Sequence, residues 1–187
     1  MGWPDPHRKT HEPGGSDEIE KLPAVSSCID ITSPGANIED AVTKKHSHLT
    51  AMFAAKSTSA SGQAIPINTW LDIAFNQEIF DTGDDYANNV FTAPIDGKYQ
   101  INLTAKIYNI DTAATFYNLK INATNSFYIL YFDPNYTADL IYQSDTLSAL
   151  IDMDANDTAK CQVYQVGGTA QSKVAQSTTE FSGFLVQ

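Results

Sequence analysis

The chain has 187 residues, enough for one domain and an appendage, and 42% of them are hydrophobic, so we expect a sizeable core. Its formal net charge is -11, and a surface this negative repels phosphate backbones, so nucleic-acid binding is not expected. The two cysteines, Cys28 and Cys161, do not have zinc-binding spacing, and no run approaches the roughly 20 apolar residues of a membrane span.

The first 37 residues are rich in proline, glycine, serine and charge. The stretch PHRKTHEPGGSDEIE has no hydrophobic periodicity and predicts an extended segment that orders only against a partner. It also contains no apolar stretch typical of a signal peptide, so we do not expect secretion through the usual route.

A short helix is predicted next, over residues 38–46, with Asn37 as its N-cap. Acidic residues occupy the first turn and lysines the last turn, an order that suits the helix dipole. Its apolar stripe is narrow, so such a helix is unstable alone. Either identical helices meet around an axis, or the helix docks onto the rest of the chain; the stripe consists of Ile38, Ala41 and Val42.

From Leu49 onward the pattern changes to short alternating runs separated by turn signals such as Asp96-Gly97 and Gly167-Gly168. Many short strands at roughly even spacing, without long helical patterns between them, predict an all-β sandwich or barrel. The predicted strands cover residues 52–58, 67–75, 89–93, 98–108, 115–122, 126–132, 146–153, 159–166 and 179–186.

The clearest alternation lies in residues 98–108, where apolar and polar side chains point to opposite faces. We expect the polar face, Gln100 to Lys106, to be partly covered or to meet another subunit. Cys161 sits in another alternating strand and is expected to be a small buried hydrophobe. The apolar face predicted to enter the core consists of Tyr99, Ile101, Leu103, Ala105 and Ile107.

A set of aromatic, acidic and glycine positions carries a family resemblance. Their spacing resembles the signature of the globular head of complement component one, subcomponent q, a jelly roll of the tumour-necrosis-factor type. The stretch EFSGFLV, residues 180–186, looks like the closing strand of that family. The likeness spans residues 49–187, and it implies a jelly-roll sandwich that forms a homotrimer. The positions that carry it are Phe75, Asp81, Tyr86, Phe91, Gly97 and Tyr99.

Each signature position has a structural role in this interpretation. The aromatic residues are expected to fill the core. Gly97 is expected to supply a turn conformation closed to other residues. Gly183, inside a predicted strand, is expected to mark a close backbone approach, for example at a subunit contact.

The N-terminal segments PHRKTHEPGGSDEI and ANIEDAVTKKHSHLT look like linker motifs of bacteriophage tail and fibre proteins. Together the two likenesses imply that residues 1–48 anchor the chain to capsid or tail proteins and that residues 49–187 form the head. We therefore expect a non-enzymatic protein of the virion surface. It would be a head fibre, a decoration protein or a tail appendage that adheres to a host-surface glycan or protein. The alternatives are a cellular lectin-like module of the same fold and a polysaccharide depolymerase.

All four histidines precede the head, and two of them, His46 and His48, are candidate metal ligands. In a trimer they would place six imidazoles around one axis, a set that suits iron or nickel. The alternative is polar filler at a module junction. No other cofactor is expected.

Catalytic patterns are weak in the head. It contains no histidine, which excludes Ser-His-Asp and Cys-His arrangements, and none of its fourteen carboxylates is singled out as an acid pair. Residues 152–157 imitate the start of a calcium loop without its glycine and glutamate, so we interpret them as a turn. Residues 81–85 are expected to be a solvated acidic loop.

Two further features concern binding. The polar stretch 167–178 predicts a flexible surface loop at one end of the head. An aromatic run is suited to stacking on sugars, although a core or interface role is the alternative. That run consists of Phe127, Tyr128, Tyr131, Phe132, Tyr136 and Tyr142.

Overall fold

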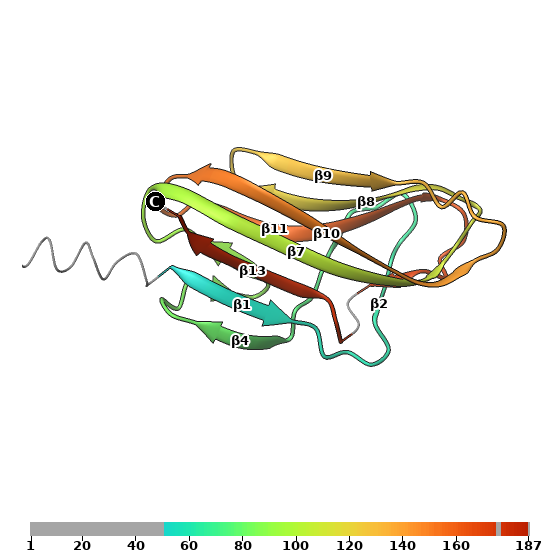
Figure 1. Cartoon of the computed structure of the whole chain (residues 1–187), viewed down its shortest axis with the longest axis horizontal. Coiled ribbons are helices and arrows are strands. Elements are labelled where there is room, and N and C mark those ends of the chain that lie inside the picture. Colours follow the sequence, from blue (N-terminus) through green and yellow to red (C-terminus); the bar gives the residue numbers. More distant parts are fainter. Residues whose placement is uncertain (1–50, 175–176, 187) are drawn as a thin grey trace, which may run out of the picture. The chain divides into compact units, whose positions relative to one another are not determined.

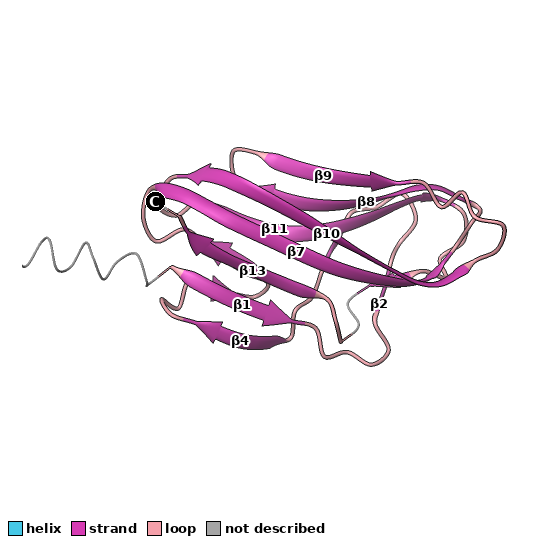
Figure 2. Cartoon of the chain, viewed as in Figure 1, coloured by secondary structure: helices cyan, strands magenta, loops and turns pink. Residues whose placement is uncertain are grey.

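A computed structural model describes residues 51–174 and 177–186. The predicted anchor, the predicted helix over 38–46 and the His46–His48 pair lie outside these residues. The described residues form strands and loops without any helix, as Figure 2 shows, so the all-β prediction is confirmed. Within them no helix is long and apolar enough to cross a membrane.

Thirteen strands are found in the described residues, and all pairings between them are antiparallel (Figure 1). They are β1 (Met52–Lys56), β2 (Gln63–Ala64), β3 (Leu71–Asp72), β4 (Gln77–Asp81), β5 (Tyr86–Ala87), β6 (Val90–Thr92), β7 (Gly97–Ile110), β8 (Ala114–Ala123), β9 (Phe127–Phe132), β10 (Leu140–Met153), β11 (Thr158–Gly167), β12 (Lys173–Val174) and β13 (Glu180–Leu185).

The first sheet is built around the long strand β7. β10 pairs with one edge of β7 along its whole length, from Gly97 to Ile110. The other edge is shared by β13 and, further along, by β12. β1 and then β4 continue the sheet beyond β13. The second sheet has the order β5-β6-β11-β8-β9, with β3 pairing with β11, so the two sheets make the two layers of a jelly-roll sandwich.

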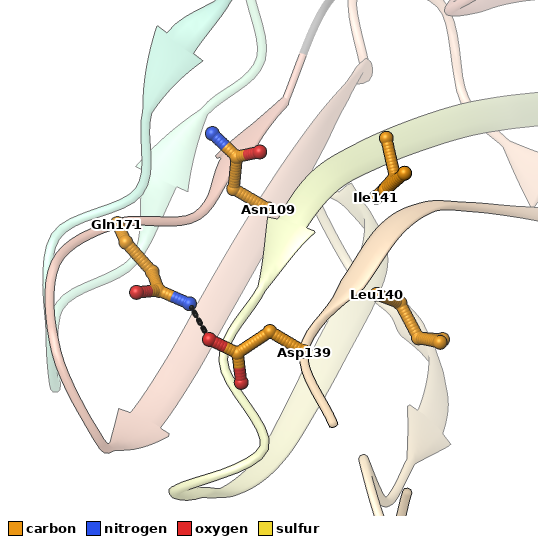
Figure 3. Close-up of a pocket in the computed structure, with 5 residues that line it drawn as sticks. All are labelled: Asn109, Asp139, Leu140, Ile141 and Gln171. Atoms are coloured by element: carbon orange, nitrogen blue, oxygen red, sulfur yellow. Dashed lines mark hydrogen bonds between the residues drawn. The ribbon is translucent and has the colours of Figure 1, made fainter. Parts of the chain in front are cut away.

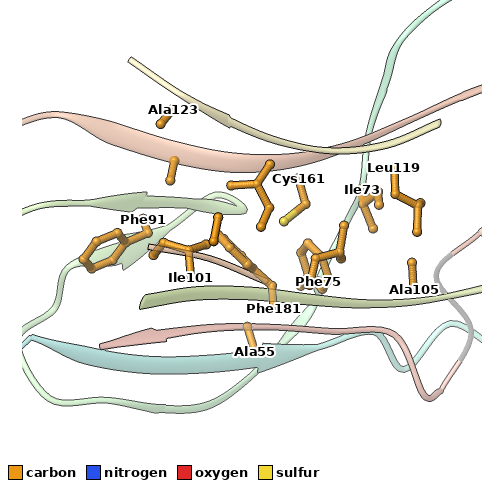
Figure 4. Close-up of a cluster of buried hydrophobic side chains, with 14 of the residues drawn as sticks. Ala55, Ile73, Phe75, Phe91, Ile101, Ala105, Leu119, Ala123, Cys161 and Phe181 are labelled. Carbon is orange, nitrogen blue, oxygen red and sulfur yellow. The ribbon is translucent and has the colours of Figure 1, made fainter. Parts of the chain in front are cut away.

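The core lies between the sheets, and the alternation in β7 builds it as predicted: Tyr99, Ile101, Leu103, Ala105 and Ile107 are all buried. The predicted core residues Phe75, Tyr86 and Phe91 are buried as well. Phe53 stacks on the rings of Tyr86 and Phe91, with centroids 5.2 and 4.7 Å apart. Figure 4 shows Phe91, Phe181 and Cys161 among the buried side chains, so the interpretation of Cys161 as a small hydrophobe is confirmed.

Gly183 fulfils the predicted close approach, but the close neighbours belong to its own core. A Cβ added there would lie 2.6 Å from Ile101 Cδ1 and 2.7 Å from Phe53 Cε1. The prediction for Gly97 is wrong, because its φ is not positive and it begins β7 opposite Met153. Asp96, beside it, links this turn to the β10–β11 turn by accepting a hydrogen bond from the Ala155 amide.

Two predicted strands have different extents. Of the predicted strand 67–75, Leu71–Asp72 pairs with β11 and Ile67 makes an isolated bridge to Gln165, while Asn68 between them has a φ of 55° that breaks extended structure. β10 begins at Leu140, six residues before the predicted start, and continues as one ladder along β7. The short strands β2, β4, β5 and β12 were not predicted at all.

The edge strands on the two sides of the sandwich differ in how they are hydrogen-bonded. On one side, the Tyr128 hydroxyl of β9 donates to the Leu150 carbonyl of β10 at 3.3 Å, and Tyr136, in the connection between the two strands, donates to Gln143 at 2.8 Å. On the other side, β4 pairs only with β1, and the pairing register shifts at Ala54–Ala55. This β-bulge leaves Ile79 without a partner in the ladder.

Candidate functional site

Three connections meet at one end of the sandwich, which we call the loop end: β7–β8, β9–β10 and β11–β12 (at the right of Figure 1). The buried carboxylate of Asp111 ties two of them together. It accepts hydrogen bonds from the Thr169 amide, from the Thr169 hydroxyl at 2.8 Å and from the Ala113 amide at 2.8 Å. Burial raises the pKa of Asp111, but these hydrogen bonds outweigh burial and hold the pKa below its usual value.

Asp139 ties the third connection to the other two. Its carboxylate accepts hydrogen bonds from the Gln171 carboxamide at 2.7 Å, from the Thr112 amide at 2.9 Å and from the Thr112 hydroxyl at 2.8 Å. The hydrogen bonds from Gln171 and Thr112 lower the pKa of Asp139. The loop end is therefore held together by two carboxylates that are ionised at neutral pH.

A pocket of about 290 Å³ opens beside Asp139. Its polar wall carries one carboxylate and two carboxamides, and its apolar wall is aliphatic (Figure 3). Asn109 has a φ of 52°, and its carboxamide makes no hydrogen bond within the described residues. The lining residues are Asn109, Asp139, Leu140, Ile141 and Gln171.

The outer face of the first sheet is polar and uncharged in the middle of the β7–β10 pairing, from Asn102 to Thr104 and from Thr146 to Ser148. Gln100 donates to the Ser148 hydroxyl at 2.9 Å, and the hydroxyls of Thr104 and Thr146 lie 3.2 Å apart. The polar side chains of β7 are partly covered, as the sequence predicted. This face offers hydrogen-bonding groups that are already paired with each other.

Exposed apolar side chains are found on this face and on the strands at its sides. Of the twelve large hydrophobic side chains exposed in the described residues, seven belong to β9, β10 and the connection between them, which we call the β9–β10 edge. Four more form the β4–β13 patch, comprising Ile79, Phe80, Phe184 and Val186. The β9–β10 edge consists of Phe127, Tyr128, Tyr131, Tyr136, Ile141, Tyr142 and Leu150.

A further aromatic cluster lies on the outer face of the second sheet. The Trp70 and Tyr164 rings are 4.9 Å apart, and Lys120 Nζ lies 3.9 Å from the centre of the Trp70 ring. Asp72 and Lys160 form an ion pair nearby, at 2.9 Å. Both rings are half-buried and Lys120 covers one of them, so we assign this cluster to packing.

The family model of the C1q domain matches residues 51–186, which is most of the chain. The chain belongs to the C1q domain family. This C1q domain is similar in structure to the globular domain of a zebrafish complement 1qA protein. The two have 15% sequence identity and a TM-score of 0.53, and the match covers 73% of this chain and 98% of the other.

The C1q domain is also similar to vertex protein P5 of the bacteriophage PRD1. Here the sequence identity is 17% and the TM-score 0.50, with 74% of this chain and 98% of the other covered. No curated protein sequence matches the chain. Both structural likenesses agree with the predicted jelly roll, and C1q domains are generally trimeric recognition or structural modules.

The aromatic run predicted for sugar stacking or packing is divided by the C1q fold. Phe132 alone turns inward, where its ring stacks on the buried Tyr117 ring at 4.9 Å. The other five residues of the run belong to the exposed β9–β10 edge. The run therefore supplies one core contact and a broad apolar surface.

The loop predicted over residues 167–178 is not simply a flexible surface loop. Ser172 and Val174 are fully buried, and the Ser172 hydroxyl lies 2.6 Å from the Tyr117 hydroxyl. Sequence reasoning missed Gln171 as a pocket residue, and it also missed Asn109. The signal available was the placement of Asn109 at the end of a long strand, just before a turn.

The acidic stretches behave as turns in the described residues. Asp81 accepts hydrogen bonds from the amides of Gly83 and Tyr86. Asp157 accepts a hydrogen bond from the Asp154 amide and closes the β10–β11 turn, as predicted. No group of three or more histidine, cysteine, aspartate or glutamate residues suited to a metal is found among the described residues.

Proposed function

We propose that the chain is a non-enzymatic structural protein of a bacteriophage virion, in which a trimeric C1q head is attached to the particle by residues 1–48. The observation that carries the proposal is the C1q fold of residues 51–186, together with the structural likeness of the chain to a vertex protein of PRD1. The likeness of the leading segments to phage tail and fibre motifs supports the same assignment. We assign the chain to the head fibres, the decoration proteins or the short tail attachments.

Two separate apolar surfaces support the trimer. A ring of identical subunits uses a heterologous contact, in which one patch of each subunit meets a different patch of the next. The β9–β10 edge and the β4–β13 patch lie on different elements and are both exposed, with Phe127 at 66% and Phe184 at 44%. Burying one against the other around a three-fold axis removes both from water, which favours association.

The charge of the chain fits exposure on a particle rather than contact with packaged nucleic acid. Fourteen acidic and six basic side chains lie in residues 49–187, and this excess of negative charge repels phosphate. Adhesion to host-surface glycan or protein is the role we assign to the end of the head that projects outward.

The deciding experiment is cryo-electron microscopy of purified particles, together with mass measurement of the isolated protein. The proposal expects density for three copies of the head at a vertex, on the capsid surface or at a tail tip. Particles that lack the chain, or a protein that light scattering finds as a single subunit at working concentration, would refute it.

A cellular recognition module is the second candidate, and the likeness to a complement 1qA globular domain favours it. The same measurement separates the two. A chain associated with the cell surface in the absence of particles supports the second candidate.

A further inference from the structure

We propose that the pocket at the loop end binds a neutral saccharide through Asn109, Asp139 and Gln171. Its biological meaning, a host-surface glycan receptor, rests on the proposed virion role. The site itself rests on the chemistry of the pocket, which is independent of that role.

The polar wall is organised before any ligand arrives. Asp139 is fixed by three hydrogen bonds from Thr112 and Gln171, and the Gln171 carboxamide oxygen lies 3.3 Å from the Thr169 hydroxyl. Thr169 is held in turn by the buried Asp111. A wall of this kind loses little conformational freedom on binding, so more of the interaction energy remains as affinity.

Asn109 supplies hydrogen-bonding capacity that the fold does not use. Its carboxamide offers two donors and an acceptor, and none of them is engaged within the described residues. Its left-handed backbone, with a φ of 52°, is a conformation that asparagine tolerates better than most residues. The side chain is thereby presented at the rim of the pocket, where Figure 3 shows it across from Gln171 and Asp139.

The ligand class follows from which groups are present. Sugar hydroxyls both donate and accept, so they match an accepting carboxylate and two carboxamides, while the C–H groups of a sugar ring pack on Leu140, the aliphatic lining residue outside the proposed subunit contact. No cation lines the pocket and the chain has a net charge of -11, which disfavours acidic sugars. Asp139 already accepts three hydrogen bonds, which weakens its attraction for an ammonium or guanidinium group. The volume, about 290 Å³, is at the lower limit of ligand pockets, about 300 Å³.

The pocket lies at the end of the head remote from its attachment. Residues 1–50 join the head at Ala51, beside Met52. Met52 pairs with Phe184 of β13, and Phe184 pairs with Gln100 of β7. Asn109 is nine residues further along β7, or roughly 30 Å at ~3.3 Å per residue. The pocket and Ala51 therefore lie at opposite ends of β7 and its neighbours.

The test uses the full-length assembled protein, because Ile141 also belongs to the proposed subunit contact. Glucose, galactose, mannose, rhamnose and N-acetylglucosamine are screened by saturation-transfer NMR and titration calorimetry, with glucuronic acid and arginine as charged probes. We expect at least one neutral sugar to bind with a dissociation constant on the order of 1 mM and both charged probes to bind less.

Asn109→Asp is the decisive variant, because aspartate keeps the shape and tolerates the left-handed backbone but removes both donors and adds negative charge. Asn88→Asp is the matched control: Asn88 is exposed, has a φ of 53° and does not line the pocket. We expect the first variant to weaken sugar binding about tenfold or more and the second to leave it unchanged. Unfolding curves and a molar mass in solution that match those of the unmodified protein establish that both variants fold and assemble.

The proposal is overturned if no neutral sugar binds at concentrations up to ten times about 1 mM. It is also overturned if arginine binds more tightly than every sugar, or if the two variants bind sugar equally well. Particles that carry the chain while no sugar binds would remove the pocket assignment alone. Sugar binding by a chain that is absent from particles would remove the virion role alone.

Discussion

Gly183 is the direct cross-strand partner of Phe53, and the space left by its missing side chain is filled by the Phe53 ring and the Ile101 side chain. Gly183→Ala would force a Cβ to within 2.7 Å of the ring, so we expect a loss of about 1–3 kcal/mol in the free energy of unfolding. Urea denaturation measures the loss. The control is Gly83→Ala, at an exposed position without a positive φ, and equal stability of the two variants would contradict the account.

The carboxylate of Asp111 makes the loop end sensitive to acid. Its pKa is lower in the folded protein than the usual value of about 3.9, so its contribution is fully present above pH ~4 and is lost as the pH falls through the lower folded pKa. Asp111→Asn should lower the free energy of unfolding by about 1–3 kcal/mol at pH 7. The reason is that the amides and the hydroxyl that donate hydrogen bonds to Asp111 lose their charged acceptor. Unfolding measured from pH 7 to pH 3 should show the difference from the unmodified protein shrinking towards the acid end.

The control for this experiment is Asp133→Asn, an exposed carboxylate in the β9–β10 connection that accepts no hydrogen bond within the described residues. A pH profile for Asp111→Asn that runs parallel to that of the unmodified protein would show that Asp111 is not the group responsible.

The β9–β10 edge predicts how assembly responds to charge. Phe127→Asp places a carboxylate on a side chain that is 66% exposed, so the subunit should still fold, while burial at a subunit contact becomes costly. We expect light scattering to find single subunits instead of trimers. Ile95→Asp, at an exposed apolar position outside both patches, should leave the trimer intact, and dissociation of both variants would indicate a general charge effect.

The thiol of Cys161 should be unreactive in the folded protein. Complete burial raises its pKa and blocks access of reagents to the thiolate, which is the reactive form. In a Cys28→Ser background, a chromogenic disulfide reagent should modify no thiol in the native protein and one thiol per chain in denaturant. Rapid native-state labelling would mean that the two sheets separate readily around Cys161.

The histidine pair that precedes the head in the sequence predicts the metal content of the protein. If His46 and His48 hold a transition metal on the trimer axis, element analysis should find one iron or nickel per three chains, and His48→Ala should remove it. Protein purified without a metal-affinity step that contains no metal at this ratio would leave the two histidines as polar filler.

Sequence patterns predicted the structure of the head best where buried and partly covered residues alternate regularly along a strand. Residues 99–107 of β7 alternate without interruption, and every expected core position from Tyr99 to Ile107 is buried. The first half of β10 was missed because its exposed residues, among them Ile141 and Tyr142, do not face a covering layer, so their order carries no alternation. β4 was missed because an edge strand with Glu78 and a bulge at Ile79 has no buried side to mark it.

The pocket was beyond the reach of the sequence for a different reason. Its lining comes from three stretches that are remote from one another, at residue 109, residues 139–141 and residue 171. They are brought together by the pairing of β7 with β10 and β12, and that pairing register is a tertiary property. Local patterns describe each stretch but do not encode which others lie beside it.

The bulge in β4 bears on what happens when many copies are crowded together on one surface. A straight, bare strand at the rim of a sheet offers its backbone to any neighbour, and polymers grow by that route. The interrupted register of β4, beside the acidic Glu78 and Asp81, denies an incoming strand a continuous template. Copies held at high local density are therefore not joined by strand addition at β4, which removes one route by which they could extend into fibrils.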